Sequence, residues 1–359
     1  MIDFTSSLYL AMRHNSGELS GWNQLTMGVP AAIYESKQSE RLSQHIATMQ
    51  RLETGVAAPS TLHLYWDLFT FLRKLKIVVF ADEKIYPVSK YGIERLIARQ
   101  IPVYSFRHMD ANHLYDLLIK TNLKFKTPVL LTDGFCPQCG KAAPIKDYSA
   151  IMKPYKGNII IDDTQAFGIF GERVNEEVYG KGGGGILKWQ NIMDNQVITI
   201  VSLAKAFGAP MAVISGNASF ISSFKTESET SVYSSPVSIA HLNAAANAIR
   251  INQTSGDQLR NKLFKNVLLL RDDLYQSGIR LSGGIFPVQS ITDLSPKQTY
   301  DLYKKLSAKK IKTALVKSHI TQQPAISIVV RCDHTTEEIL SLSDSIKQLY
   351  PFGKKQGEI

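Results

Sequence analysis

Short apolar runs alternate with amphipathic segments through the middle of the chain. The apolar runs are rich in β-branched residues and predict strands, while apolar positions spaced three or four apart predict helices. The predicted strands span residues 76–83, 102–107, 128–134, 158–165, 197–205 and 211–216. The predicted helices span residues 39–52, 89–99, 113–120 and 146–157. Because most strand runs are continuous rather than alternating, they predict a mainly parallel sheet with helices on both faces, an α/β architecture.

The last third of the chain has a different pattern. Leu259, Leu263, Val267, Leu270 and Leu274 share one face of a predicted helix. Strands are then predicted at 284–291 and 325–331, and a final helix at 335–349. We therefore expect an N-terminal segment over 1–50, a large domain over 51–255, and a smaller C-terminal α+β domain with its connecting helix over 256–359.

Composition narrows the class of protein. A hydrophobic content of 44% and a charged content of 20% are typical of a globular chain and exclude a disordered one. No apolar run reaches the roughly 18 residues of a spanning helix, and the first residues do not resemble a secretory signal. Three cysteines are too few for a disulfide framework and favour a reducing, cytoplasmic compartment. We therefore expect no membrane partner.

The net charge of +10 favours anionic partners such as phosphates, coenzyme A or an acidic carrier protein. The basic residues are scattered along the chain, so nucleic acid is not an expected partner.

The segment VSLAKAFGAP, residues 201–210, places Lys205 directly after a strand of buried character. A lysine in such a position is costly unless it is paired, exposed or chemically used, and a lysine with a lowered pKa forms Schiff bases with carbonyls. The alternative is an ordinary surface lysine at the end of a strand.

The segment IIIDDTQAFGIFG, residues 159–171, brings Asp162 and Asp163 to the carboxyl end of another strand. Ligands of open α/β sheets bind at that edge, and an aspartate there can pair with a protonated ring nitrogen. Metal binding or a helix cap would also explain the pair of aspartates.

Taken together, these two segments resemble motifs of the fold-type I pyridoxal phosphate (PLP) enzymes. DDTQAFGIFG is similar to the family's DEAHxxGxxG-like motif, and SLAKAFG to its TLxKxFG-like motif. The resemblance is greatest to the α-oxoamine synthase branch and runs from residue 3 to residue 339. It implies a PLP transferase whose mostly parallel central sheet lies in a PLP-binding large domain.

The resemblance implies a role for each matching residue. Lys205 would form the Schiff base with PLP and afterwards transfer protons, and Asp162 would hold the pyridine nitrogen protonated. Ser202 matches a hydroxyl residue near the cofactor phosphate. Gln165 stands where the family has a histidine, and it can donate a hydrogen bond but cannot titrate near neutrality. Tyr86 aligns with the residue that stacks on the cofactor ring, although a tyrosine in a turn is the alternative.

The phosphate of the cofactor is expected at the start of a helix, where free N–H groups bind anions. Ser60, Thr61 and Leu62 replace the family's SGY-like turn. YSSPVS, residues 233–238, resembles a segment whose hydroxyl reaches a phosphate across the dimer interface, a role that falls to Ser234 or Ser235 here. The resemblance therefore implies a homodimer with shared sites.

A further family feature is altered in this chain. The arginine that binds the substrate carboxylate aligns with Ser327, and Arg331 lies four residues further on the same predicted strand face. This change puts a free α-amino acid substrate in question, because an arginine–carboxylate pair would normally hold it.

Three further motifs have simpler interpretations. Cys136 and Cys139 form a CxxC without a second pair, which we interpret as loop cysteines rather than a metal or redox site. GKGGGG, residues 180–185, lacks phosphate-loop spacing and is interpreted as a flexible loop and a candidate flap. His334, at the start of the last helix, is expected to act in its cap rather than in catalysis.

The leading functional hypothesis is an acyltransferase that joins an amino acid or amine substrate to an acyl thioester, delivered by acyl-CoA or an acyl carrier protein. The second hypothesis is an aminotransferase on the same fold, and the third is a binding protein that inherited the fold.

Overall fold

The computed structural model describes residues 1–174, 177–318 and 321–352. Its contacts divide the chain into two compact units. The larger unit comprises residues 12–136 and 142–257, and the smaller comprises residues 1–11, 137–141 and 258–359. Each unit has its own sheet.

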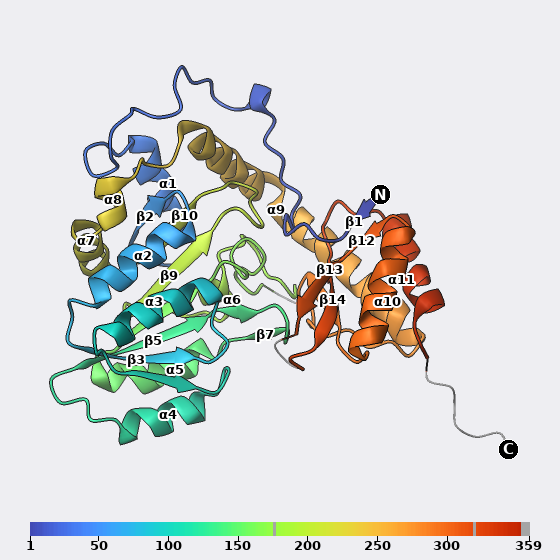
Figure 1. Cartoon of the computed structure of the whole chain (residues 1–359). Coiled ribbons are helices and arrows are strands. Elements are labelled where there is room, and N and C mark those ends of the chain that lie inside the picture. The colour runs from blue at the N-terminus through green and yellow to red at the C-terminus, as the bar shows by residue number, and fades with distance from the viewer. Residues whose placement is uncertain (175–176, 319–320, 353–359) are drawn as a thin grey trace. The chain divides into compact units, whose positions relative to one another are not determined.

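The larger unit is organised around a seven-stranded sheet (Figure 1). In spatial order its strands are β2 (Thr54–Ala58), β10 (Ala212–Gly216), β9 (Val197–Ser202), β8 (Asn158–Asp162), β5 (Thr127–Asp133), β3 (Ile77–Asp82) and β4 (Val103–Phe106). The four pairs from β9 to β4 are parallel, and β10 is antiparallel to both of its neighbours. The predicted mostly parallel α/β sheet is confirmed, whereas the short strand β2 had no signal in the sequence pattern.

The central strands are buried on both faces. On β3, Val79 belongs to a cluster with helix residues such as Leu68 and Phe220, while the alternate residues Val78 and Phe80 are equally inaccessible. Successive side chains of a strand point to opposite faces, so burial of both sets means that protein covers both sides of the sheet. This two-sided burial is the physical reason for the continuous apolar runs.

Among the described residues, nine α-helices precede or follow the strands of the large sheet. Their bounds are α1 (Lys37–Met49), α2 (Thr61–Leu72), α3 (Pro87–Ala98), α4 (Ala111–Lys120), α5 (Ile145–Met152), α6 (Ile186–Trp189), α7 (Ala218–Thr226), α8 (Glu229–Tyr233) and α9 (Ile239–Gln276). Helices α2, α3 and α7 contribute to the apolar cluster on one face of the sheet. The long helix α9 crosses the division between the units at residues 257 and 258. Short 3₁₀ turns, η1 (Ser16–Glu18) and η2 (Lys153–Tyr155), and the small hairpin β6 (Phe135–Cys136) and β7 (Lys141–Ala142) complete these connections.

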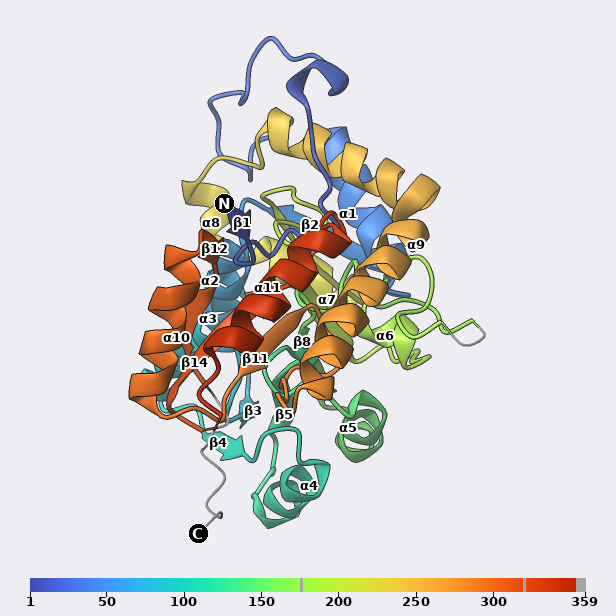
Figure 2. The same cartoon turned by 90° about the vertical axis from the view of Figure 1, so that its right-hand side faces the viewer.

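The smaller unit is an α+β structure, seen in Figure 2 with α10 and α11 toward the viewer. Its three-stranded antiparallel sheet has the order β11 (Val288–Ile291), β14 (Pro324–Val329) and β13 (Ala314–Lys317). A separate parallel pair joins β1 (Ile2–Asp3) to β12 (Ile311–Lys312). The helices are α10 (Pro296–Ala308) and α11 (Thr336–Leu349).

The cap of α11 differs from the expected one. Thr335 is the N-cap, and it forms a capping box with Glu338. His334 instead accepts the Arg331 N–H at Nδ1 (3.1 Å), and its Nε2 lies 3.0 Å from the Asp3 carbonyl oxygen. His334 therefore holds the N-terminal strand against β14 rather than capping the helix.

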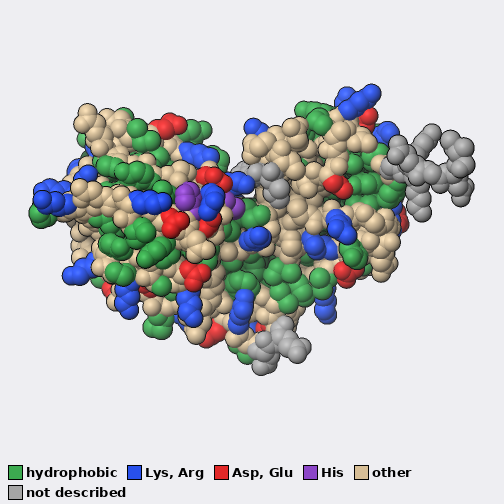
Figure 3. All heavy atoms as spheres, turned by 90° about the horizontal axis from the view of Figure 1, so that it is seen from below, with side chains coloured by type: hydrophobic (Ala, Val, Ile, Leu, Met, Phe, Trp, Pro, Cys, Tyr) green, Lys and Arg blue, Asp and Glu red, His purple; other side chains and the backbone are tan. Residues whose placement is uncertain are grey.

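The described residues also show how hydropathy and charge are distributed. Within the described residues, no helix is both long enough and apolar enough to cross a membrane. On the face drawn in Figure 3, lysine and arginine side chains are dispersed among acidic and apolar ones.

Candidate active site

The carboxyl ends of β8 and β9 form the centre of the candidate site. The two strands are parallel neighbours, with Asp162 opposite Ile200, so their ends lie at the same edge of the sheet. Asp162 is the last residue of β8 and Ser202 the last of β9. Lys205 follows in a tight turn that closes with a hydrogen bond from the Gly208 N–H to the Lys205 carbonyl oxygen (3.3 Å). Gly208 has φ +62°, which favours glycine at this position.

Two aspartates act on the electrostatics of Lys205. Burial lowers the pKa of Lys205 below its ordinary value, while the negative charges of Asp162 and Asp133 act in the opposite direction. A lysine with a lowered pKa gives up its proton more readily and then has a nucleophilic amine. The two principal residues identified from the sequence, Lys205 and Asp162, are thus within electrostatic reach of each other.

Asp162 is held by two donors. Its Oδ1 accepts the Thr164 N–H at 3.0 Å, and its Oδ2 accepts the Tyr65 hydroxyl at 2.8 Å. Tyr65 is only 3% exposed, and burial and the charge of Asp162 raise its pKa well above the ordinary value, so the phenol remains a donor. The carboxylate is therefore fixed in orientation at the end of its strand.

Asp163, the other member of the pair, faces away from this chemistry. It is fully buried, and its Oδ2 accepts the Ile186 N–H at 3.0 Å. A side chain at Gly134 or Gly185 would overlap its carboxyl oxygens. Burial raises the pKa of Asp163 well above its usual range, which favours a neutral carboxyl group. Asp163 thus anchors the loop that precedes α6.

The glycine-rich loop 180–185 is bound to the rest of the larger unit. The Gly182 N–H donates to Asp257 Oδ1 at 2.9 Å, and the Gly182 carbonyl accepts from Asn252 Nδ2 at 2.9 Å. The Gly185 N–H donates to the Phe170 carbonyl at 2.7 Å. These hydrogen bonds fix the loop as a connection between the end of β8 and α6. They therefore do not support the expected flap.

Tyr86 lies at the same edge of the sheet. Its backbone N–H donates to Asp133 Oδ1 at 3.1 Å. Burial and the negative charges of Asp162 and Asp133 raise the pKa of the Tyr86 phenol, which places its side chain within their electrostatic range. The ring is 40% exposed and available to a ligand, and its stacking role stays a prediction.

The turn after β8 is linked to the end of β9. The Thr164 hydroxyl oxygen accepts the Ser202 N–H at 3.1 Å, and Ser202 Oγ accepts the Ala204 N–H at 3.3 Å. Gln165 follows in the same turn and is half-buried. Thr164 therefore braces the two segments that carry Asp162 and Lys205, a contact with no signal in the sequence.

The start of α2 has the features that an anion site requires. Ser60 is the N-cap, its Oγ shares a hydrogen bond with His63 Nδ1 (2.9 Å), and the first turn has no acidic residue. The N–H groups of Thr61 and Leu62 belong to the first turn, where they have no partner within the helix. Tyr65, one turn further along α2, donates to Asp162. The helix start is therefore close to the candidate site.

Ser234 and Ser235 follow α8. Ser234 Oγ donates to the Thr230 carbonyl at 2.7 Å, whereas Ser235 is exposed. Both serines and Pro59, next to the α2 cap, line one pocket of the larger unit. Ser235 is thus the more accessible hydroxyl, and contact with a phosphate stays a prediction for both residues.

The smaller unit contains the two positions that were compared with the family's substrate-binding arginine, Ser327 and Arg331. Ser327 is 6% exposed in the middle of β14. The Arg331 guanidinium donates to Asp333 Oδ1 at 2.8 Å and to the Asp3 carbonyl at 3.2 Å. Arg331 therefore has its charge compensated inside its own unit.

The arrangement in the larger unit fits PLP. A lysine with a lowered pKa, a fixed carboxylate and a helix N-terminus without an acidic residue match the aldehyde, the ring nitrogen and the phosphate of that group. The sequence predicted Lys205, Asp162 and the helix start as cofactor-binding groups, and these roles stay predictions. It did not identify Tyr65, Thr164 or Asp133, since a tyrosine within an apolar helix resembles an ordinary core residue.

Sequence comparison places this arrangement in a known family. A model of the family described as "Aminotransferase class I and II" matches residues 66–346. The chain is 22% identical over its whole length to an 8-amino-7-oxononanoate synthase of Petrotoga mobilis and covers 90% of that protein. It is 24% identical to 8-amino-7-oxononanoate synthase 2 of Bacillus subtilis, over 90% of this chain and 78% of the relative.

Solved structures share the fold. Serine palmitoyltransferase from S. paucimobilis, solved with a bound PLP–myriocin aldimine, superposes with a TM-score of 0.83 at 15% identity, covering 97% of this chain and 87% of that one. 8-Amino-7-oxononanoate synthase from Francisella tularensis superposes with a TM-score of 0.75 at 18% identity, covering 97% of both chains. The predicted fold-type I architecture is thereby confirmed.

Proposed function

Because the chain belongs to the class I and II aminotransferase family, we propose that it is a PLP-dependent acyltransferase of the α-oxoamine synthase type. The observation that carries this proposal is the placement of Lys205 within electrostatic reach of Asp162 at the carboxyl edge of the sheet. The relatives named 8-amino-7-oxononanoate synthase support the choice of branch.

Several parts of the larger unit would hold the cofactor. Lys205 would bind its aldehyde carbon, and Asp162 would accept a hydrogen bond from its ring nitrogen. The first-turn N–H groups of α2 would bind its phosphate, with Ser202 and the 234–235 serines as further hydroxyl donors. Tyr86 would cover the ring, and Gln165 would donate its amide to the ring hydroxyl. When bound, the cofactor supplies an electron sink for negative charge at a substrate carbon.

Two residues of the chain would then take part in the reaction: Lys205 would transfer a proton, and Asp162 would stabilise a positive charge. The lowered pKa of Lys205 suits an amine that takes a proton from the substrate α-carbon and returns it. Asp162, fixed by Tyr65 and Thr164, would stabilise the positive charge of the ring nitrogen.

The substrates proposed are an amino acid or amine and an acyl thioester, delivered by coenzyme A or by a carrier protein. The net charge of +10 suits either anionic carrier. Arg331 is bound to Asp333 and to the Asp3 carbonyl, so we propose that a substrate carboxylate is recognised by other groups.

We also propose a homodimer in the cytoplasm. Exposed apolar side chains gather in two segments of the larger unit, at Leu25, Met27 and Ile33 and at Val232 and Tyr233. Clustered apolar exposure of this kind marks an interaction surface, and a second copy of the chain would cover it. The three cysteines, none of them in a disulfide, fit a reducing compartment.

Product analysis of the PLP-loaded protein tests the proposal. Candidate amino acids and acyl-CoA or acyl-carrier thioesters are supplied together, and free thiol, carbon dioxide and the amino ketone are measured. We expect thiol release that depends on both substrates and is lost in Lys205→Ala. Lys181→Ala is the matched control, because Lys181 is an exposed lysine of the loop 180–185. Thiol release that survives unchanged in Lys205→Ala would exclude the proposed role.

An aminotransferase is the second candidate, favoured by Gln165 at the family histidine position and by an aromatic residue, Tyr86, at the stacking position. The same assay separates the two functions, since exchange of an amino acid for a keto acid without thiol release identifies the aminotransferase.

A further inference from the structure

The hairpin after β5 carries two cysteines at its turn. Cys136 ends β6 and is 6% exposed, and Cys139 lies three residues later in the turn before β7. Both are thiols that no disulfide joins. The turn itself returns the chain beside Cys136, so the spacing of the two sulfurs is set within one hairpin. Residues 137–141, which form the turn of this hairpin, are grouped with the smaller unit.

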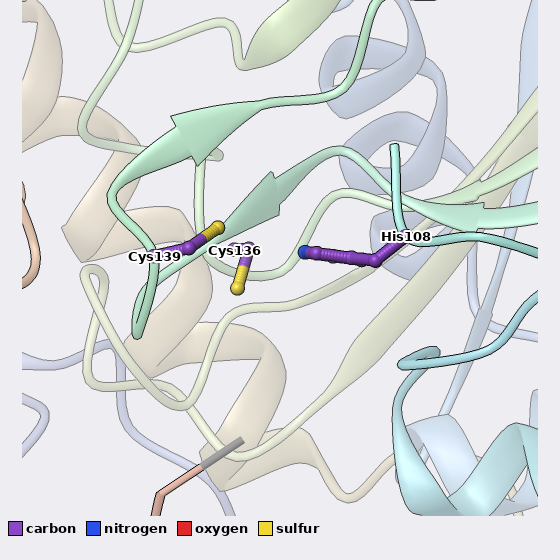
Figure 4. Close-up of side chains that lie close together, drawn as sticks. All are labelled: His108, Cys136 and Cys139. Carbon is purple, nitrogen blue, oxygen red and sulfur yellow. The ribbon is translucent and has the colours of Figure 1, made fainter. Parts of the chain in front are cut away.

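His108 approaches the same hairpin from a neighbouring connection. It lies just after β4, at the outer end of the sheet, and its side chain is 15% exposed. The ring points toward the cysteine sulfurs, as Figure 4 shows. One ligand atom each from His108, Cys136 and Cys139 lies within 4.8 Å of the others.

An aspartate orients the imidazole from behind. His108 Nδ1 lies 2.8 Å from Asp82 Oδ1, at the end of the adjacent strand β3. Asp82 is 2% exposed and is fixed by the N–H groups of Lys84 (2.8 Å to Oδ1) and Met109 (2.9 Å to Oδ2). With Nδ1–H donated to the carboxylate, Nε2 is the nitrogen directed at the sulfurs. A carboxylate behind a histidine in this way fixes the tautomer needed for metal binding.

We propose that His108, Cys136 and Cys139 form a binding site for a zinc-type divalent cation. Two thiolates and one imidazole are a donor set that zinc prefers, and calcium or magnesium would require oxygen ligands. In a tetrahedral zinc site, bonds of about 2.0–2.3 Å place the ligand atoms about 3.5–3.8 Å apart. The three ligand atoms, which lie within 4.8 Å of one another, would reach these separations after side-chain movements of about 1 Å.

Three protein ligands leave the fourth position of the tetrahedron to water or to an external ligand. The cation would join the connection after β4 to the hairpin after β5, two connections at the carboxyl edge of the same sheet. Its effect would be to hold the outer part of that edge together. The proposed ligands do not include Lys205 or Asp162, so the metal site does not rest on the proposed reaction.

Metal titration of the reduced, PLP-loaded full chain without a histidine tag tests the site. Zinc binding is measured by competition with a chromophoric chelator, and cobalt(II) is titrated for near-ultraviolet thiolate-to-metal absorption. We expect one zinc per chain, a cobalt–thiolate band and a rise in melting temperature of about 3 °C at saturating zinc. His108→Gln, Cys136→Ser and Cys139→Ser should each weaken zinc binding at least about 100-fold, and Asp82→Asn about tenfold.

Cys332→Ser is the matched control, because Cys332 is a buried cysteine of the smaller unit outside the cluster. It should retain zinc affinity and the cobalt band. The proposal is overturned if the reduced wild-type chain binds no zinc, or if Cys139→Ser binds it as tightly as wild type. The cobalt spectrum of the wild-type chain shows whether thiolates bind the metal even where a variant fails to fold.

Discussion

Lys205 and Arg331 are both basic residues near the ends of buried strands, yet their surroundings differ. Lys205 lies at the edge of the large sheet, where burial lowers its pKa and the nearest carboxylates are held by other donors. Arg331 lies in the smaller unit with its guanidinium bound to Asp333 and to the Asp3 carbonyl. The comparison shows that hydrogen-bond partners, rather than charge or strand position, decide whether a basic group remains available for chemistry.

Among the substitutions that test this comparison, the one at Asp162 is expected to reduce activity most. Asp162→Asn removes the negative charge opposite Lys205, and we expect turnover to fall about 10²–10³-fold with PLP still bound. Asp163→Asn is the matched control and should keep turnover within about threefold, because Asp163 bonds to Ile186 rather than facing the site. Steady-state rates and the cofactor absorbance of both variants measure the difference. Equal losses in the two variants would contradict the separate roles.

Substitution of Tyr65 is expected to reduce activity by an intermediate amount. Tyr65→Phe removes one donor from Asp162 while keeping the buried ring, and we expect about a tenfold lower kcat, equivalent to about 1.4 kcal/mol. Tyr9→Phe is a suitable control, as Tyr9 is another buried tyrosine, in the smaller unit. An unaltered kcat in Tyr65→Phe would show that the contact does not support Asp162.

The buried carboxyl group of Asp163 is expected to make the stability of the folded chain depend on pH. Burial raises the pKa of Asp163 in the folded chain, so the folded state binds a proton that the unfolded state releases. Its contribution is present below the unfolded pKa of about 4 and is lost as pH rises toward the folded pKa. Asp163→Asn should therefore gain melting temperature relative to wild type as pH increases from about 4 to about 8. A difference that stays constant over this range would contradict a neutral carboxyl group.

Arg331 should give the smallest effect on activity. Arg331→Ala removes bonds inside the smaller unit, so we expect a decrease in melting temperature of about 1–4 °C and a KM for the amino substrate within about twofold of wild type. Thermal unfolding and substrate titration measure the two quantities. A tenfold rise in KM without loss of stability would mean that Arg331 binds the substrate after all.

Much of the fold follows from local pattern. The runs at 76–83, 128–134, 158–165 and 197–205 correspond to β3, β5, β8 and β9 because strands buried on both faces need continuous apolar sequence. The antiparallel direction of β10 and the presence of β2 depend on pairing between distant segments, so neither has a local signal.

The residues of the candidate site likewise differ in whether local sequence predicts them. Lys205 and Asp162 could be predicted as site residues because motif and strand position coincide, whereas Tyr65 and Asp133 act through contacts across the fold. The CxxC at 136–139 resembles ordinary loop cysteines until the fold brings His108 beside it.

The most direct test of the account is borohydride reduction of the PLP-loaded chain, followed by peptide mass spectrometry. We predict a single lysine modified by the reduced cofactor, Lys205, and no modified lysine in Lys205→Ala. Modification of a different lysine, or a chain that retains no cofactor at all, would contradict the assignment of the β8–β9 edge as the active site.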